Sequence, residues 1–210
     1  MPALSEPGRS GGAEGNERLT VITGTVLLIL LAAEGFTILR LSSLLTLHFF
    51  LGMLLLGPVA LKAGSVTYRF FRYYSGNEPY RRKGPPHPLL RILGPFIMLL
   101  TIGVFGSGVI LGLVGPAARQ PWLLLHKATF ILWFGAMAIH VLAYIRRLPR
   151  LLSAEARGGT PAIGGRGVRL SLLTASLAAG LVIALLTVHD VGVWQTSGFL
   201  THHGHHHRIG

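Results

Sequence analysis

Five long apolar stretches constrain the fold of this chain more than any other feature of its sequence. A transmembrane helix needs about 20 predominantly apolar residues to cross a hydrocarbon core of about 30 Å. The stretches run from about residue 19 to 39, 44 to 66, 89 to 114, 122 to 145 and 168 to 188. The sequence therefore predicts an all-α fold, a polytopic bundle of about five transmembrane helices.

The composition agrees with lipid as the solvent of this chain. Half of its 210 residues are hydrophobic, its mean hydropathy is +0.57, and 12% are charged, against about 25% in soluble domains. Basic residues outnumber acidic ones by 19 to 7, yet they lie in short loops beside the apolar stretches and form no basic amphipathic module. We therefore expect a lipid bilayer with anionic headgroups as the partner, and no nucleic acid.

Basic residues also predict how the helices are oriented. Two loops on the same side of the predicted bundle are rich in them: Arg69, Arg72, Arg81, Arg82, Lys83 and Arg91 in one, and Arg146, Arg147, Arg150, Arg157, Arg166 and Arg169 in the other. The other two connections offer only Arg40, Arg119 and Lys127. Because cytoplasmic loops carry the excess of Lys and Arg, we expect a multi-pass plasma-membrane protein with a cytoplasmic N-terminus and an external C-terminus.

The same pattern divides the chain into segments. Residues 1–18 are rich in Gly, Ser, Pro and Glu, which predicts a disordered cytoplasmic tail. Residues 19–147 are expected to form a four-helix core, residues 148–167 a flexible cytoplasmic loop, and residues 168–190 a peripheral fifth helix. Residues 191–210 then form an external tail with weak capacity for Zn, Cu or Ni. Its histidines are His202, His203, His205, His206 and His207.

The chain has no cysteine, which excludes disulfides, Cys-ligated zinc, Fe–S clusters, thiolate catalysis and covalent c-type haem. Ionisable residues inside membrane spans are costly, so each is a functional hypothesis. His126 and His140 lie fourteen residues apart on the fourth span, and His48 and Lys62 repeat that interval on the second. Fourteen residues return to within about 40° of the same helix face, about 21 Å further along. Since the two spans run in the same direction, His48 should lie at the depth of His126, and Lys62 at the depth of His140.

Histidine pairs of this kind suit haem. A haem between two helices needs one axial ligand from each and small residues that admit the macrocycle. Gly52 follows His48 by one turn, and further small residues occur on three helices. They are Gly57, Gly64, Gly103, Gly106, Gly108, Gly112, Ala128, Gly135, Ala136 and Ala138. Glycine also serves close helix packing without a cofactor.

The segments LHFFLGMLLLGPVALK and LHKATFILWFGAMAIHVLAYI resemble the haem-binding helices of bacterial membrane-bound b-type cytochromes. That group includes four-helix di-haem cytochromes, cytochrome b subunits of hydrogenases and formate dehydrogenases, and ferric reductases. The resemblance covers about residues 44 to 145. It depends on a histidine followed four residues later by glycine, and on two histidines fourteen residues apart.

The resemblance implies a haem b with His48 and His126 as axial ligands, near the outer surface. A di-haem member would have histidine where this chain has Lys62. A second haem at His140 would therefore need Lys62 as a neutral amine ligand or another partner. Alternatively, Lys62 keeps its charge and pairs with a haem propionate or extends to the membrane boundary. We expect one haem, and a second haem remains an open alternative.

The resemblance also implies the function, which is electron transfer through the membrane between a quinone or cytoplasmic donor and an external acceptor. No dehydrogenase, flavin or nucleotide motif is visible, so a donor enzyme would be a separate protein, and the chain would be an oxidoreductase component rather than a stand-alone enzyme.

Several residues have alternative interpretations. Glu34 is expected at a depth near His48 and His126, so the three could instead hold a divalent metal or transport protons or ions. A structural membrane protein without cofactor is the third hypothesis. In it, the histidines form hydrogen bonds between helices, and His140 is interfacial. His87 is expected to be solvated among prolines, and His189 with Asp190 to form a polar cap. Aromatic residues beside the arginines after the second span are interpreted as an interfacial belt.

Overall fold

The structure, a computed structural model, describes residues 11–82, 84, 88–145, 165–192 and 194. Within these ranges it is all-helical and has no strands. Five helices are each long and apolar enough to cross a membrane, which confirms the predicted fold class. They are α1 (Gly11–Ile38), α2 (Leu41–Tyr74), α4 (Pro88–Val114), α5 (Arg119–Ile145) and α7 (Arg166–Thr187). The described residues also form two short elements, α3 (Glu78–Arg81) and the 3-10 helix η1 (Val188–Val191).

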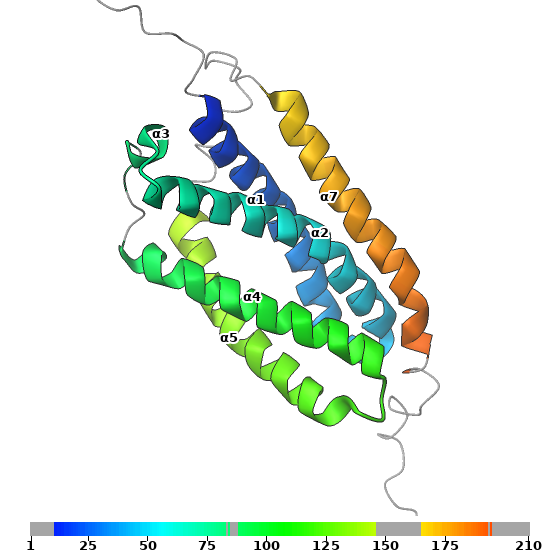
Figure 1. The fold of residues 1–210 in the computed structure, drawn as a ribbon. Helices are drawn as coiled ribbons and strands as arrows, with labels where there is room; N and C mark the ends of the chain where they lie inside the picture. The colour runs from blue at the N-terminus through cyan, green and yellow to red at the C-terminus, as the bar shows by residue number, and fades with distance from the viewer. Residues whose placement is uncertain (1–10, 83, 85–87, 146–164, 193, 195–210) are drawn as a thin grey trace, which may run out of the picture.

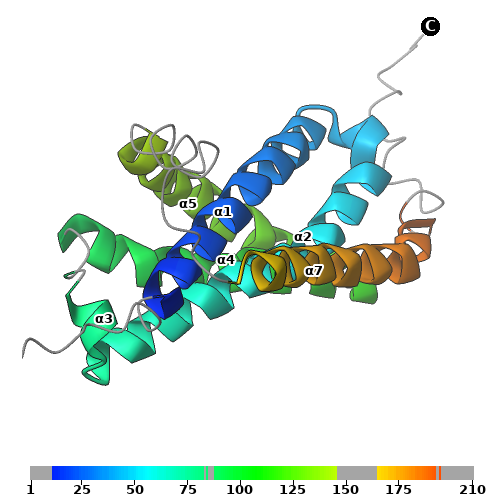
Figure 2. The same cartoon turned by 90° about the horizontal axis from the view of Figure 1, so that it is seen from above.

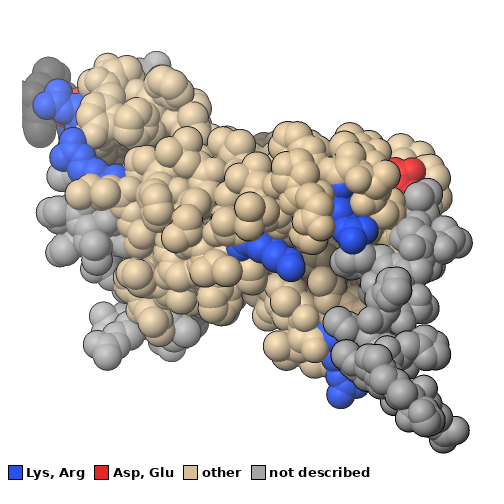
Figure 3. Space-filling model, turned by 90° about the horizontal axis from the view of Figure 1, so that it is seen from below, with Lys and Arg blue, Asp and Glu red and all other residues tan. Residues whose placement is uncertain are grey.

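The surface of the bundle carries many large apolar side chains, as contact with lipid requires. Large hydrophobic side chains point outward from every long helix, and these examples are between 44% and 68% exposed: Ile29, Leu47, Leu99, Ile131 and Leu186. Figure 3 shows a face that is mostly uncharged and is interrupted by a few separate groups of Lys and Arg. A soluble domain rarely exposes so many large apolar side chains, so the helices are compatible with a bilayer environment.

The helices form two groups that meet along α2 and α4. In the first group, α2 lies between α1 and α7 and packs extensively on both. The second group is the pair α4 and α5. Figures 1 and 2 show α7 on the side of α2 that faces away from α4 and α5. The candidate site residues of α2 and α5 therefore belong to different groups.

The fifth span is not peripheral, so that prediction was wrong. Gly57 of α2 and Gly180 of α7 bring the two backbones into direct contact. A Cβ atom on Gly57 would overlap the carbonyl oxygen of Ser176, and one on Gly180 would overlap that of Leu54. Small residues permit such close crossings between membrane helices. This crossing makes α7 part of the packed unit.

The first helix begins at Gly11, so residues 11–18 are helical where the sequence predicted a disordered tail. Tertiary contacts explain the difference. Asn16 Nδ2 donates to the carbonyl oxygen of Ser65 on α2 at 3.1 Å, and Tyr80 Oη donates to the carbonyl oxygen of Gly12 at 3.3 Å. These bonds anchor a segment whose composition alone gives no reason to fold.

The end of the bundle where α2 stops is basic and aromatic, and we call it the basic end. α2 ends at Tyr74, and Gly76 follows with φ +81. The Arg72 guanidinium lies over the rings of Tyr68 and Tyr80, at 5.8 and 5.9 Å from their centres. Tyr80 is buried beneath them. His87, most of the predicted 148–167 loop and the histidine tail lie outside the described residues.

Candidate functional site: two facing imidazoles

His48 and His126 lie next to each other inside the bundle, in agreement with the prediction that they share the same depth in the membrane. Their ring centres are 6.5 Å apart, and the ring planes are nearly perpendicular at 82°. His48 comes from α2 and His126 from α5. Because α2 packs mainly on α1 and α7, and α5 packs on α4, the two neighbouring imidazoles come from separate helix groups.

The hydrogen bonds of His48 assign its protonated nitrogen. Thr37 Oγ1 lies 2.6 Å from the carbonyl oxygen of Glu34 and 2.9 Å from His48 Nδ1. A carbonyl only accepts, so the Thr37 hydroxyl donates its one hydrogen there and accepts from His48. Glu34 Oε1 lies 3.0 Å from the same Nδ1 and accepts as well. Nδ1 therefore carries the hydrogen, and in the neutral ring Nε2 carries the lone pair.

His126 has the same tautomer for the same reason. Its Nδ1 lies 2.9 Å from the carbonyl oxygen of Val104 on α4, which only accepts. Ser107 Oγ lies 3.2 Å from Nδ1 and 2.6 Å from the carbonyl oxygen of Gly103. The serine hydroxyl thus donates to Gly103 and leaves His126 Nδ1 as a donor. Nε2 of His126 therefore also keeps a lone pair.

The two lone pairs give the site its chemical character. Among the described residues, neither Nε2 atom has a hydrogen-bond partner. Metal-ligating histidines have this arrangement, in which one nitrogen is oriented by an outer hydrogen bond and the other binds. Two imidazoles that coordinate one metal from opposite sides at about 2 Å place their ring centres about 6 Å apart, whereas a tetrahedral angle brings them to about 5 Å. The observed separation of 6.5 Å is nearer to the first of these values.

Two glycines adjoin the imidazoles and their acceptors. A Cβ atom on Gly108 of α4 would lie 3.2 Å from His126 Cε1, so a side chain there would press on the ring. Gly52, expected to make room for a macrocycle, instead faces Glu34, whose Oε1 would lie 3.6 Å from its Cβ. Gly52 therefore lies beside the carboxylate that accepts from His48.

Lys62 and His140 are the second predicted pair. They are close enough to interact electrostatically. However, Lys62 Nζ donates to the carbonyl oxygen of Thr20 on α1, beside a hydrogen bond of 2.8 Å between Thr20 Oγ1 and Ser65 Oγ. Lys62 thus ties α2 to α1 through an N–H donor.

No family model, curated protein or solved structure matches the chain significantly. The resemblance to b-type cytochromes therefore stays a prediction, and support for a function comes from the geometry of the site.

The alternative metal site of Glu34, His48 and His126 does not form as a group. Within the described part of the chain, no three His, Asp or Glu side chains gather closely enough to hold a metal ion. Glu34 reaches the Nδ1 side of His48, and there it accepts a hydrogen bond. Its contact orients the imidazole and does not complete a shared coordination sphere.

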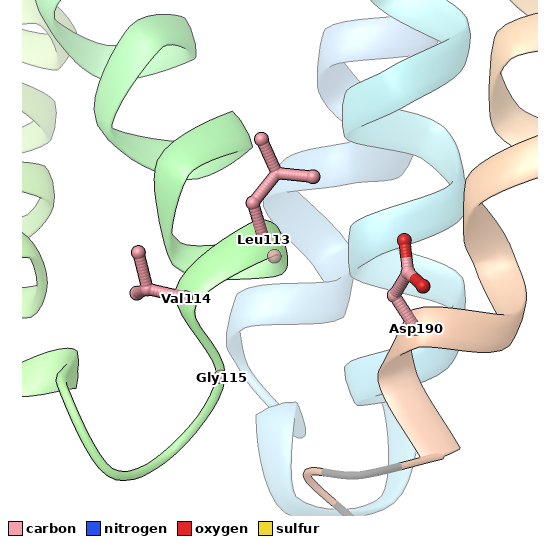
Figure 4. A pocket seen from close by; sticks show the side chains of 5 residues that line it. Leu113, Val114, Gly115 and Asp190 are labelled. Atoms are coloured by element: carbon pink, nitrogen blue, oxygen red, sulfur yellow. The ribbon is translucent and has the colours of Figure 1, made fainter.

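A pocket of about 240 Å³ lies at the end of the bundle opposite the basic end. Gly112, Leu113, Val114, Gly115 and Asp190 line it, and Figure 4 shows Leu113 and the Asp190 carboxylate facing the same space. His189 Nε2 lies 3.0 Å from Asp190 Oδ1, as expected for a polar cap. The pocket is smaller than the 300 Å³ or so typical of ligand sites, and neither imidazole lines it.

Sequence reasoning missed the residues that orient the imidazoles, Thr37, Ser107 and the carbonyl of Val104. Ser and Thr in membrane helices usually bond to carbonyls of their own helix, and Thr37 and Ser107 do so here. Their additional contact with a histidine depends on a neighbouring helix, so no local signal distinguishes them. A main-chain carbonyl has no sequence signal at all.

Proposed function

We propose that this protein transfers electrons through a membrane by means of a non-covalently bound haem b, held between α2 and α5 by His48 and His126. The observation that carries the proposal is the pair of imidazoles with free Nε2 lone pairs and ring centres 6.5 Å apart. When bound, the haem supplies one-electron chemistry, and the protein sets its ligands and its surroundings.

The residues of the chain have separate tasks in this proposal. His48 and His126 offer Nε2, while Thr37, Glu34 and the Val104 carbonyl hold the rings in the required tautomer and orientation. The apolar helices exclude water from the site. We propose one haem rather than two, because the second pair offers Lys62, which is held against α1, in place of a second histidine.

The position of the site suggests how electrons would pass. We propose a plasma-membrane location with the basic end facing the cytoplasm, since positive loops are retained on that side. His48 and His126 then lie in the outer half of the membrane. A quinone or a separate redox protein would supply electrons, because the chain shows no nucleotide or flavin motif.

A purely structural role is the second candidate, and one observation favours it. Each histidine already joins two helices through Nδ1, His48 to Thr37 of α1 and His126 to Val104 of α4. Such bonds between membrane helices stabilise by about 0.6 kcal/mol on average, and they need no cofactor.

An absorption spectrum of the detergent-purified protein, oxidised and then reduced with dithionite, distinguishes the two candidates. We expect a reduced b-type α-band and about one haem per chain. His48→Leu and His126→Leu should each abolish it. The control is His189→Leu, which removes a histidine whose side chain is 76% exposed, and it should keep the band. A folded wild-type protein without a Soret band after haem-supplemented expression would refute the cytochrome proposal and leave the structural role.

A further inference from the structure

Glu34 is a carboxylate in an unusual setting. Its side chain is 14% exposed within an apolar helix, and Oε1 lies 3.0 Å from His48 Nδ1. Oε2 is buried and has no hydrogen-bond partner among the described residues. In the same part of the chain Glu34 forms no salt bridge with Lys or Arg, so its only ion-pair partner is His48. An acid so placed is costly inside a membrane and is a functional hypothesis by default.

The location of Glu34 makes that cost greater. It lies one turn before α1 ends at Ile38, where the carbonyl ends of the helix carry partial negative charge. The structure nevertheless fixes the carboxylate there. Its Oε1 lies 3.0 Å from His48 Nδ1 and beside Gly52 of α2, where a Cβ atom would lie 3.6 Å from it.

The two imidazoles consequently differ in the charge of their acceptors. His48 donates toward a carboxylate and a hydroxyl, whereas His126 donates toward a main-chain carbonyl and lies near a hydroxyl. We propose that Glu34 is a positioning residue that acts through His48, making it the stronger electron donor of the two ligands and lowering the reduction potential of the site. This inference rests on the proposed haem function.

The direction of the effect follows from charge. A carboxylate that accepts from Nδ1 increases the basicity of the imidazole and the donor strength of Nε2. No Lys or Arg in the described part of the chain pairs with Glu34, and the low dielectric of the bundle strengthens the field of its carboxylate form. Both effects stabilise the oxidised, more positive state of the iron relative to the reduced state. Outer hydrogen bonding and burial are recognised means of tuning haem potentials.

Glu34→Gln tests the inference, with spectroelectrochemical titration of the haem-loaded protein as the readout. The amide keeps the shape and an acceptor oxygen but removes the charge. We expect reduction to become about tenfold more favourable, an upward shift of about 59 mV for one electron. Glu78→Gln is the control, since it removes the same charge from an exposed carboxylate at the basic end, and it should leave the potential unchanged.

The possible outcomes separate this inference from the proposed function. A wild-type protein that binds no haem refutes the function itself. Haem in both proteins with equal potentials refutes only the role of Glu34. If Glu34→Gln does not retain haem, Glu34→Asp is titrated instead, because the shorter side chain withdraws the charge from Nδ1 and should also raise the potential. If neither variant holds haem, Glu34 serves assembly and the tuning role is overturned.

Discussion

Replacing Gly57 with alanine tests the structural finding that differs most from the sequence prediction, the integration of α7 into the bundle. The new methyl group would fall on the carbonyl oxygen of Ser176, a main-chain atom that cannot turn aside as a side chain can. The helices must therefore separate over the whole crossing. Overpacking of this kind costs about 1–3 kcal/mol, and we expect the upper part of that range because backbone faces backbone.

The same crossing offers a second probe and a matched control. Gly180→Ala places a methyl group on the carbonyl oxygen of Leu54 and should be similarly destabilising. Since one separation of α2 and α7 relieves both overlaps, the double variant should lose less than the sum of the two. Gly64→Ala is the control on α2, because Gly64 has no atom within 4 Å of its would-be Cβ. It should be neutral or stabilise the helix by up to about 1 kcal/mol.

The assay is equilibrium unfolding of the purified protein in mixed micelles with increasing SDS, followed by helical circular dichroism. The prediction concerns the difference in unfolding free energy between each variant and the wild type. If Gly57→Ala unfolds like Gly64→Ala, α2 and α7 do not touch at this point. The close crossing, and with it the central position of α2, would then be incorrect.

Two further predictions concern single aromatic side chains. Trp133 Nε1 donates to Thr101 Oγ1 at 2.9 Å between α5 and α4, so Trp133→Phe should lose about 1 kcal/mol of unfolding free energy from this bond in addition to the packing of the larger, buried ring. In a Thr101→Val background the loss should therefore be about 1 kcal/mol smaller. Burial raises the pKa of the Tyr80 hydroxyl above its usual value of about 10. The unfolded chain therefore ionises first, and stability is lost as the pH rises past about 10. Tyr80→Phe should show a smaller alkaline loss in thermal melts between about pH 8 and pH 11, and an unchanged pH profile would contradict the burial argument.

The sequence alone was sufficient for the five spans and for the pairing of His48 with His126. Both follow from local rules. The length of an apolar stretch reports whether it can cross a bilayer, and the rise of 1.5 Å per residue fixes the depth of each histidine. The break after Tyr74 was predictable for a similar reason, since the Gly and Pro residues that follow cannot continue a helix.

The sequence could not show which helices are neighbours. In lipid, the outward face of a helix is as apolar as its packed face, so hydropathy does not mark the partner surface. The glycines of α2 were read as room for a macrocycle, yet Gly57 packs against α7 and Gly52 faces Glu34. Only the folded bundle decides between these uses.

Tertiary structure also decided the chemistry of the ionisable residues. Sequence placed Glu34 at the depth of two histidines, but its contact with Nδ1 of His48 alone makes it an orienting acceptor rather than a third metal ligand. Lys62 likewise acquired its partner, the Thr20 carbonyl, from a helix about forty residues earlier. A hydrogen bond depends on the position and direction of both groups within a few tenths of an ångström, and that information exists only once the helices have packed.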